Sequence, residues 1–264
     1  MKVSICKRRP ILSPCGLKGI EYQVDTYIRC EHYCYYCYVL PQAETDWSKE
    51  ILIHSDIIDQ LSNELDKIPP QTIYMGYHTD PYQPCEAVYR QTRKVLELFL
   101  KTGFSASILT KSDLVVRDIE ILKEMNDAAI SVSVAFNDNR TRRLFEANTI
   151  DTEKRIEALN KLKEAGVRTG ALLCPIIPHI TDAIQLIDML EPYADVIWIY
   201  GLSINDRSDQ DWLNIQNIIS SQSPNLIEKI EPAVFSKDHS YWAELRESLE
   251  IQKKDRKLNL NIHI

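Results

Sequence analysis

Three cysteines, Cys30, Cys34 and Cys37, lie in one short run of the chain and are interleaved with tyrosines. At this spacing the thiols are too close to pair as disulfides without strain. A loop wrapped around one inorganic centre, however, can turn all three of them inward. The spacing therefore predicts a metal centre.

The number of thiols bears on which metal this is. A closed structural zinc site needs four ligands, usually two separated Cys-x2-Cys pairs, and no second pair follows downstream. A cubane cluster has four irons, so three cysteines leave one iron without a protein ligand. Such an iron is available to a chelating molecule, which favours catalysis. A zinc site and a plain electron-transfer cluster remain alternatives.

The composition favours one large α/β domain, because 44% of the 264 residues are hydrophobic. The sequence does not begin with a signal segment, and no apolar run approaches the ~20 residues that cross a bilayer. The odd count of seven cysteines argues against a secreted disulfide framework. We therefore expect a soluble, cytoplasmic protein with no membrane partner.

The formal net charge of -7 bears on the substrate. Proteins that bind nucleic acids usually carry a basic surface, because neutralising phosphates supplies much of their affinity. Arg140, Arg142 and Arg143 offer a local basic face, but isolated basic residues are more often solvated surface. DNA is therefore a possible substrate that the charge does not favour, and the substrate stays unknown.

Hydrophobic periodicity predicts strands and helices in regular alternation. An irregular arm over residues 1–20 precedes a first strand at 22–28, which leads directly into the cysteines. A helix between the N-cap Ser55 and the stop at Pro69 follows. Further strands are predicted at 72–75, 105–109, 130–135, 169–174 and 196–200, and further helices at 89–100, 116–125, 152–165, 183–190 and 212–219. Right-handed crossovers wind such a series into a parallel barrel or an open sheet.

The pattern Cys-x3-Cys-x2-Cys, with an aromatic residue before the third cysteine, resembles the signature of the radical S-adenosylmethionine (SAM) superfamily. The downstream sequence resembles its spore photoproduct lyase-like branch, and the resemblance runs from about Ile11 to Asp182. The segments that carry it are Thr79-Asp80-Pro81-Tyr82-Gln83-Pro84-Cys85-Glu86, Thr92-Arg93, Leu109-Thr110-Lys111-Ser112, Arg117-Asp118 and Pro175-Ile176-Ile177-Pro178. One departure is Glu146-Ala147, where family members usually show Glu-Pro.

The resemblance implies a partial (β/α)6 barrel of the TIM type over residues 21–222. A dinucleotide-type sheet fits less well, because the seven glycines form no phosphate loop after the first strand. Residues 237–254 predict a helix and residues 258–262 a strand, so we expect residues 223–264 to form an extension that packs on the barrel. In barrels of this type the chemistry collects at the carboxyl ends of the strands.

The resemblance also implies an activity. Cys30, Cys34 and Cys37 would hold one [4Fe-4S] cluster, whose open iron is chelated by the amino and carboxylate groups of SAM. One-electron reduction would cleave SAM to methionine and a 5'-deoxyadenosyl radical that abstracts hydrogen from a substrate. The chain is thus expected to be a lyase-like enzyme with an electron donor such as flavodoxin or ferredoxin.

Candidate SAM contacts follow the strand ends. Lys111 is expected to pair with the SAM carboxylate, although a solvated lysine is the alternative. Arg155 either binds that carboxylate or pairs with a glutamate one helical turn away. The residues after strand 72–75 are expected to take the ammonium group, and the backbone after strand 169–174 the adenine edge. The full set is Tyr36, Tyr77, His78, Thr79, Asp80, Lys111, Ser133, Arg155, Pro175 and Ile176.

Three residues are candidates for direct work on the substrate. Tyr38 is expected to stack on the substrate or to relay a hydrogen atom, as a corresponding tyrosine is thought to do in the lyases. Cys85 is a candidate hydrogen-atom donor, and the resemblance places the donor of the lyases at the end of strand 72–75, where this sequence has Tyr77 or His78. The alternative for Cys85 is an inert, partly buried thiol.

Overall fold

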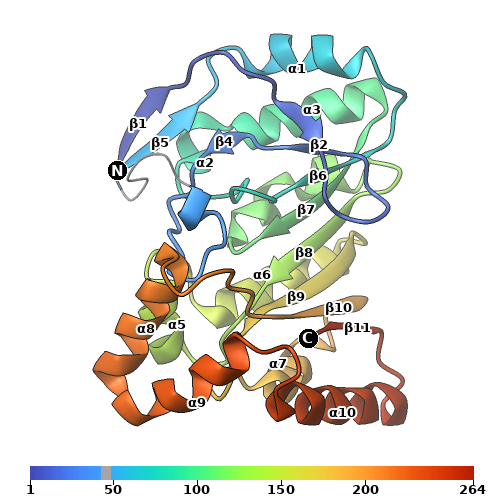
Figure 1. Ribbon diagram of the computed structural model, residues 1–264. Coiled ribbons are helices and arrows are strands. Elements are labelled where there is room, and N and C mark those ends of the chain that lie inside the picture. Colours follow the sequence, from blue (N-terminus) through green and yellow to red (C-terminus); the bar gives the residue numbers. More distant parts are fainter. Residues whose placement is uncertain (43–48) are drawn as a thin grey trace. The chain divides into compact units, whose positions relative to one another are not determined.

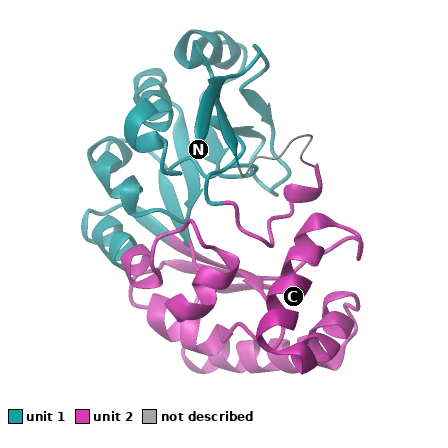
Figure 2. Cartoon of the chain, turned by 90° about the vertical axis from the view of Figure 1, so that its left-hand side faces the viewer, with its two compact units in different colours: residues 1–32, 45–132, 157–169 teal, residues 33–44, 133–156, 170–264 magenta. Residues whose placement is uncertain are grey.

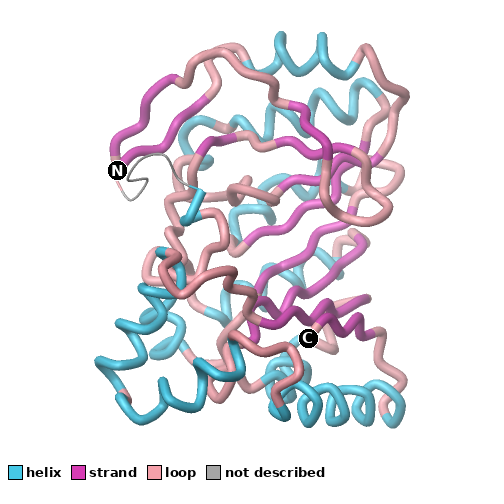
Figure 3. The backbone as a smooth tube through the Cα atoms, viewed as in Figure 1, coloured by secondary structure: helices cyan, strands magenta, loops and turns pink. Residues whose placement is uncertain are grey.

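The computed structural model describes residues 1–42 and 49–264 and shows a mixed α/β chain (Figures 1 and 3). The chain divides into two compact units. Unit 1 comprises residues 1–32, 45–132 and 157–169, and unit 2 comprises residues 33–44, 133–156 and 170–264 (Figure 2). Each unit has strands, helices and a hydrophobic core of its own.

The main sheet of unit 1 is parallel except at one edge. Strand β3 pairs in parallel with β6, which pairs with β7, which pairs with β8, whereas β2 is antiparallel to β3. These strands are β2 (Leu12–Pro14), β3 (Tyr22–Val24), β6 (Thr72–Met75), β7 (Ser105–Thr110) and β8 (Ala129–Ser133). The helices that connect them are α1 (Ile57–Leu65), α2 (Glu86–Tyr89), α3 (Gln91–Thr102) and α4 (Ile119–Leu122). The predicted parallel α/β alternation is confirmed.

Apolar residues at helical spacing fix α1 and α3 on the sheet. Ile57, Leu61 and Leu65 recur on one face of α1 and are buried, and the apolar side of α3 is buried in the same core. The two helices lie side by side (Figure 1). Helix α3 ends at Gly103, whose φ of 80° is the left-handed conformation that favours glycine at a helix end.

A second, smaller sheet of unit 1 corrects two predictions. It has the order β1 (Lys2–Ile5), β5 (Glu50–Ile53), β4 (Tyr27–Ile28). The arm over residues 1–20 was expected to be irregular but contains β1 and β2. The strand expected at 22–28 is two strands, β3 and β4, which pair in different sheets. The two strands were predicted as one because the alternation of apolar residues continues through both. This local pattern does not reveal that the pairing partner changes from β6 to β5.

Unit 2 contains the parallel strands β9, β10 and β11, in that order. Their bounds are β9 (Arg168–Ile176), β10 (Val196–Gly201) and β11 (Leu260–His263), and β9 begins in the last residues of unit 1. The helices are α5 (Asn139–Phe145), the start of α6 (Thr152–Glu164), α7 (Ala183–Leu190), α8 (Gln210–Gln222), α9 (Pro224–Val234) and α10 (Ser240–Asp255). The C-terminal helix and strand are thus confirmed, whereas α5 and α9 were not predicted.

One prediction of helix type needs correction. Residues 116–125 were expected to form a single helix, but a 3-10 helix at Asp113–Asp118 precedes the short α4. The side chain of Ser112 accepts a hydrogen bond from the Leu114 N–H and caps this segment. Separately, none of the helices in the described residues combines the length and the apolar character needed to cross a lipid bilayer.

Candidate active site

The cysteine loop starts directly after β4 and carries three thiols that form no disulfide. Cys30 belongs to unit 1, and Cys34 and Cys37 belong to unit 2, where the Cys37 N–H donates to the Cys34 carbonyl at 3.0 Å. Arg29 and Tyr33 have φ values of 73° and 43°, a left-handed conformation that costs a non-glycine residue about 1–3 kcal/mol. Other parts of the fold must therefore hold this loop.

The segment after β6 holds the Cys30 side of the loop. The Thr79 hydroxyl donates to the Arg29 carbonyl at 2.6 Å, and Oδ2 of Asp80 lies 3.2 Å from Nε2 of His32. Thr79, Asp80 and His32 are all buried. Of the residues that the sequence assigned to SAM, Thr79 therefore supports the backbone before Cys30, and Asp80 contacts the side chain of His32 after it.

Asp80 is fully engaged by protein donors. Besides the ion-pair contact with His32, Asp80 accepts hydrogen bonds from the Tyr82 N–H at 2.8 Å, the Thr110 hydroxyl at 2.7 Å and the Lys111 N–H at 2.7 Å. Burial raises the pKa of this carboxyl, but His32 and the hydrogen bonds outweigh burial, so the pKa is lowered. A carboxylate has about four acceptor positions. These contacts occupy them, so they do not support the expected contact of Asp80 with the SAM ammonium.

A buried network of hydrogen bonds around Glu86 also holds the segment after β6. Glu86 is fully buried and accepts the Thr92 N–H at 2.9 Å, Nη2 of Arg117 at 2.6 Å and the Tyr27 hydroxyl. Burial and the charge of Glu86 raise the pKa of Tyr27, which stays a neutral donor. Glu86, Thr92 and Arg117 lie in the segments that carry the family resemblance, but no role was predicted for them.

Unit 2 holds the other end of the loop. The Tyr35 N–H donates to the Phe145 carbonyl at 3.0 Å, and Nδ2 of Asn214 donates to the Tyr35 carbonyl at 3.2 Å. The neighbouring Tyr36 is buried, and its hydroxyl donates to the Glu146 carboxylate. Burial and the charge of Glu146 raise the pKa of Tyr36. Asn214 was not predicted, because its partner lies far away in the sequence.

Arg155 is buried, and its contacts favour one of its two predicted roles. Nη2 lies 2.5 Å from Oε2 of Glu146, and Nη1 donates to the Ser133 carbonyl at 2.9 Å. Nε donates to the Ile150 carbonyl at 3.3 Å. Every guanidinium nitrogen is therefore engaged. The glutamate alternative fits, although Glu146 follows α5 and is not one helical turn away, and a contact with the SAM carboxylate is not supported.

The remaining predicted SAM ligands lie at strand ends, as expected for a barrel site. Ser133 ends β8 and is buried, and Lys111 directly follows β7. Pro175 and Ile176 end β9 and are buried, with a cis peptide bond between Cys174 and Pro175. Their roles as SAM ligands stay predictions.

Two of the predicted catalytic residues, Tyr38 and Tyr77, are at least partly exposed to solvent. Tyr38 is 47% exposed, and Tyr77 is partly buried, with its ring centroid 4.9 Å from that of His78. Nδ1 of His78 lies 2.7 Å from Oδ2 of Asp25, and this hydrogen bond raises the pKa of His78. Whether these tyrosines meet a substrate stays a prediction.

Cys85 has a different environment. Its thiol is buried with Tyr27 and Ile51, and its N–H donates to the Glu31 carboxylate. Burial, together with the charge of Glu31, raises the pKa of the Cys85 thiol. Low thiolate character is typical of inert structural cysteines. These contacts favour the alternative of an inert thiol.

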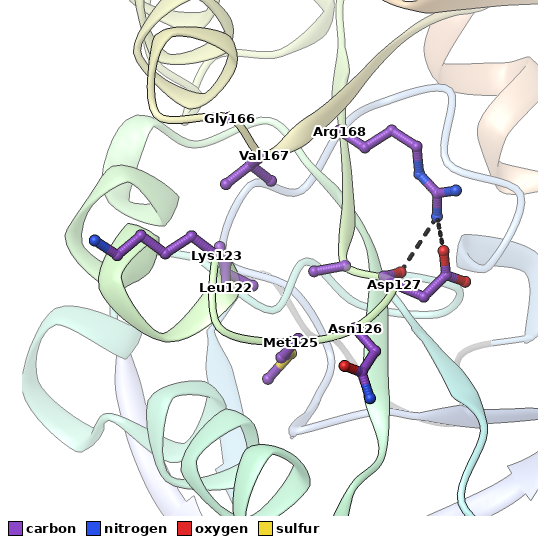
Figure 4. Close-up of a pocket in the computed structure, with 9 residues that line it drawn as sticks. Leu122, Lys123, Met125, Asn126, Asp127, Gly166, Val167 and Arg168 are labelled. Atoms are coloured by element: carbon purple, nitrogen blue, oxygen red, sulfur yellow. Dashed lines mark hydrogen bonds and ion pairs between the residues drawn. The ribbon is translucent and has the colours of Figure 1, made fainter.

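A shallow hollow of about 220 Å³ in unit 1 is separate from these residues (Figure 4). It is lined by Leu122, Lys123 and residues 125–128, before β8, and by Gly166, Val167 and Arg168, at the start of β9. Arg168 and Asp127 form an ion pair of 2.8 Å beside it. The hollow therefore lies at the amino ends of these strands. In barrels, the residues at this end usually contribute to stability and not to catalysis.

The geometry of the described residues does not distinguish the zinc alternative from an iron-sulfur cluster. A zinc ion needs ligand atoms within about 2.0–2.3 Å of one point. Among residues 1–42 and 49–264, no three Cys, His, Asp or Glu side chains form such a group. The donor set itself, three cysteines of one loop that form no disulfide, is the number that suits an iron-sulfur cluster with one open iron.

Comparison with known families decides the assignment. The family model described as the radical SAM superfamily matches residues 24–190, which include the three cysteines. The chain belongs to the radical SAM superfamily. Members of this superfamily are typically enzymes, and the cofactors it implies are a [4Fe-4S] cluster and SAM.

Relatives of this radical SAM protein include an uncharacterized protein of Methanocaldococcus jannaschii, 29% identical over 206 residues, which are 76% of this chain and 78% of that protein. The spore photoproduct lyase of Clostridium acetobutylicum is 21% identical over 207 residues, which are 78% of this chain and 61% of the lyase. The predicted resemblance to the lyase-like branch is confirmed.

Solved structures show the fold. A spore photoproduct lyase variant with bound AdoMet and dinucleoside spore photoproduct matches with a TM-score of 0.57 and 17% identity, over 84% of this chain and 66% of that chain. Streptococcus suis SuiB bound to S-adenosylmethionine matches with a TM-score of 0.53 and 14% identity, over 90% of this chain and 45% of SuiB. The predicted radical SAM barrel class is confirmed, and this chain spans about two-thirds of the lyase chain.

Proposed function

We propose that this protein is an enzyme that binds one [4Fe-4S] cluster through Cys30, Cys34 and Cys37 and reductively cleaves SAM. The main support is a family-matched loop with three cysteines that form no disulfide, and the ends of this loop are held by buried side chains. When bound, the cluster and SAM supply a 5'-deoxyadenosyl radical for hydrogen abstraction. The cofactors would carry out the bond cleavage and radical formation, and the protein would bind and orient them.

The protein residues position the loop and exclude water. Thr79 holds the backbone before Cys30, Asp80 contacts the side chain of His32 after it, and the buried Tyr36 anchors the loop between Cys34 and Cys37. Lys111, Ser133, Pro175 and Ile176 are proposed as SAM contacts because they lie at the carboxyl ends of β7, β8 and β9. Tyr38, exposed and adjacent to Cys37, is proposed to contact the substrate.

The substrate class stays open within this proposal. Similarity to spore photoproduct lyase supports a thymine lesion in DNA, whereas the net charge of -7 does not favour a long nucleic acid. The local basic face that Arg140, Arg142 and Arg143 could offer is also reduced, because Arg142 is buried and donates to the Thr149 carbonyl at 2.7 Å. A low-potential electron carrier such as flavodoxin or ferredoxin is the proposed partner.

Anaerobic reconstitution tests the proposal. We expect about four iron atoms per chain, and 5'-deoxyadenosine after addition of dithionite and SAM. Replacing Cys30, Cys34 and Cys37 by alanine should abolish both. Cys15→Ala serves as the matched control, since Cys15 is a partly exposed thiol outside the loop, and it should keep both. A triple variant that still forms 5'-deoxyadenosine would overturn the proposal.

A further inference from the structure

Gln83 has a buried side-chain amide that reaches the backbone on both sides of Cys30. Its Nε2 donates to the Arg29 carbonyl at 3.1 Å, and its Oε1 accepts the Glu31 N–H at 2.8 Å. The side chain is fully buried, so these hydrogen bonds are shielded from water. One amide group therefore bridges the residues immediately before and after the first cysteine.

The backbone at this point needs such support. Arg29 has a φ of 73°, a conformation that persists only where the surroundings enforce it. Its carbonyl accepts from Gln83 and also from the Thr79 hydroxyl at 2.6 Å. Gln83 Nε2 also donates to Thr79 Oγ1 at 2.9 Å, so the two side chains form one unit. Loss of the amide removes one donor from the part-buried Arg29 carbonyl and the acceptor of the part-buried Glu31 N–H, and a lost partner costs up to about 1–3 kcal/mol per group.

Gln83 is itself fixed in place. Its N–H donates to the Asp80 carbonyl at 3.2 Å, and its own carbonyl accepts the Glu86 N–H at 2.9 Å. Asp80 and Glu86 are buried carboxylates that hold this segment. The amide thus links a rigid part of unit 1 to the start of the cysteine loop.

We propose that Gln83 is the positioning residue for Cys30. Gln83 holds the Cys30 thiolate in its ligating position. Without Gln83, the iron that Cys30 ligates is lost more easily, while Cys34 and Cys37 keep their conformations. This inference rests on the proposed cluster. Groups that orient metal ligands are typically worth 10–100-fold in metal affinity.

Gln91 provides a matched control. It is also a buried glutamine of unit 1, and it also clamps one backbone position: its Nε2 donates to the His54 carbonyl at 2.6 Å, and its Oε1 accepts the His54 N–H at 3.3 Å. His54 is outside the cysteine loop. A general loss of stability from removing a buried amide should therefore be similar at Gln83 and at Gln91.

The test compares Gln83→Met with Gln91→Met, since methionine keeps much of the volume but cannot replace the amide hydrogen bonds. In the metal-free protein, alkylation of each cysteine by iodoacetamide is followed by mass spectrometry. In the reconstituted protein, iron loss to a chelator is followed anaerobically. For Gln83→Met we expect the alkylation rate of Cys30 to change several-fold relative to Cys37, and iron loss to be about tenfold faster or more.

Gln91→Met should leave both readouts near the wild-type values. Equal behaviour of the two variants, or equal changes at all three cysteines, would overturn the proposal. Gln83→Asn, whose amide is one methylene too short to reach both backbone positions, gives a second test should the methionine variant not fold. The alkylation measurement needs no cluster, so it separates a failure of this inference from a failure of the proposed function.

Discussion

Nη2 of Arg155 lies 2.5 Å from Oε2 of Glu146, and both side chains are buried. The Tyr36 hydroxyl donates to the same carboxylate, so the residue before the third cysteine is tied to a buried ion pair. A buried pair is not in itself strong evidence of stability, but removing one partner leaves an uncompensated charge. A single substitution in this pair is therefore expected to disturb the conformation of the cysteine loop around Tyr36.

Arg155→Met should lower the free energy of unfolding by about 3–5 kcal/mol, because Glu146 would stay buried without its cation. Urea unfolding measures this change. The double variant Arg155→Met/Glu146→Gln should recover part of the loss. Lys161→Met, which breaks the exposed pair with Glu157, is the control and should have little effect. A stable Arg155→Met variant that has lost only SAM affinity would instead indicate a carboxylate ligand.

Asp80→Asn replaces an acceptor oxygen by an amino group that faces protein donors. We expect a loss of about 1–3 kcal/mol in stability, because the donors of Thr110 and Lys111 cannot all be satisfied. We also expect a lower iron content after reconstitution, because the contact with His32 weakens. Urea unfolding and iron analysis measure the two effects. Unchanged values for both would contradict a supporting role for Asp80.

The pKa of His78, followed by NMR titration, should lie above the ordinary value because Asp25 stabilises the charged ring. Asp25→Asn should return it toward about 6.5. A raised folded-state pKa means that the pair stabilises the protein fully below the unfolded-state pKa, and that this contribution is lost as the pH rises through the folded-state value. The effect should be small, since the side chain of His78 is 44% exposed. A pKa that Asp25→Asn leaves unchanged would contradict the pairing.

Cys85→Ala should leave 5'-deoxyadenosine formation within about twofold of wild type. The thiol is buried, and its raised pKa leaves little thiolate at neutral pH. In the native protein Cys85 should also react with iodoacetamide more slowly than the partly exposed Cys15. Loss of product with intact iron content would instead make Cys85 a participant in the reaction.

The sequence was most informative where a local pattern decides the structure. The bounds of α7 were predicted as observed, because its apolar residues recur at helical spacing up to Leu190. The three cysteines were sufficient to indicate the family. By contrast, β1 was missed because it pairs only with β5, which lies far along the chain, and its own sequence has no strong alternation.

Long-range partners explain the errors at the site. Thr79 and Asp80 look like ligands in the sequence, and only the fold shows that Arg29 and His32 engage them. The choice between two roles for Arg155 likewise depended on Glu146, whose position after α5 was not predicted. The type and order of the elements follow from periodicity, whereas the partner of a buried polar side chain depends on tertiary contacts.

The most direct measurement is electron-nuclear double resonance of the reduced, reconstituted protein with SAM labelled by 15N at its amino group and by 17O at its carboxylate. We predict hyperfine coupling of both labels to the cluster, because an iron without a protein ligand is chelated by these two groups. If protein with a full cluster lacks one or both of these couplings, SAM does not chelate the iron through both groups, and the account is contradicted.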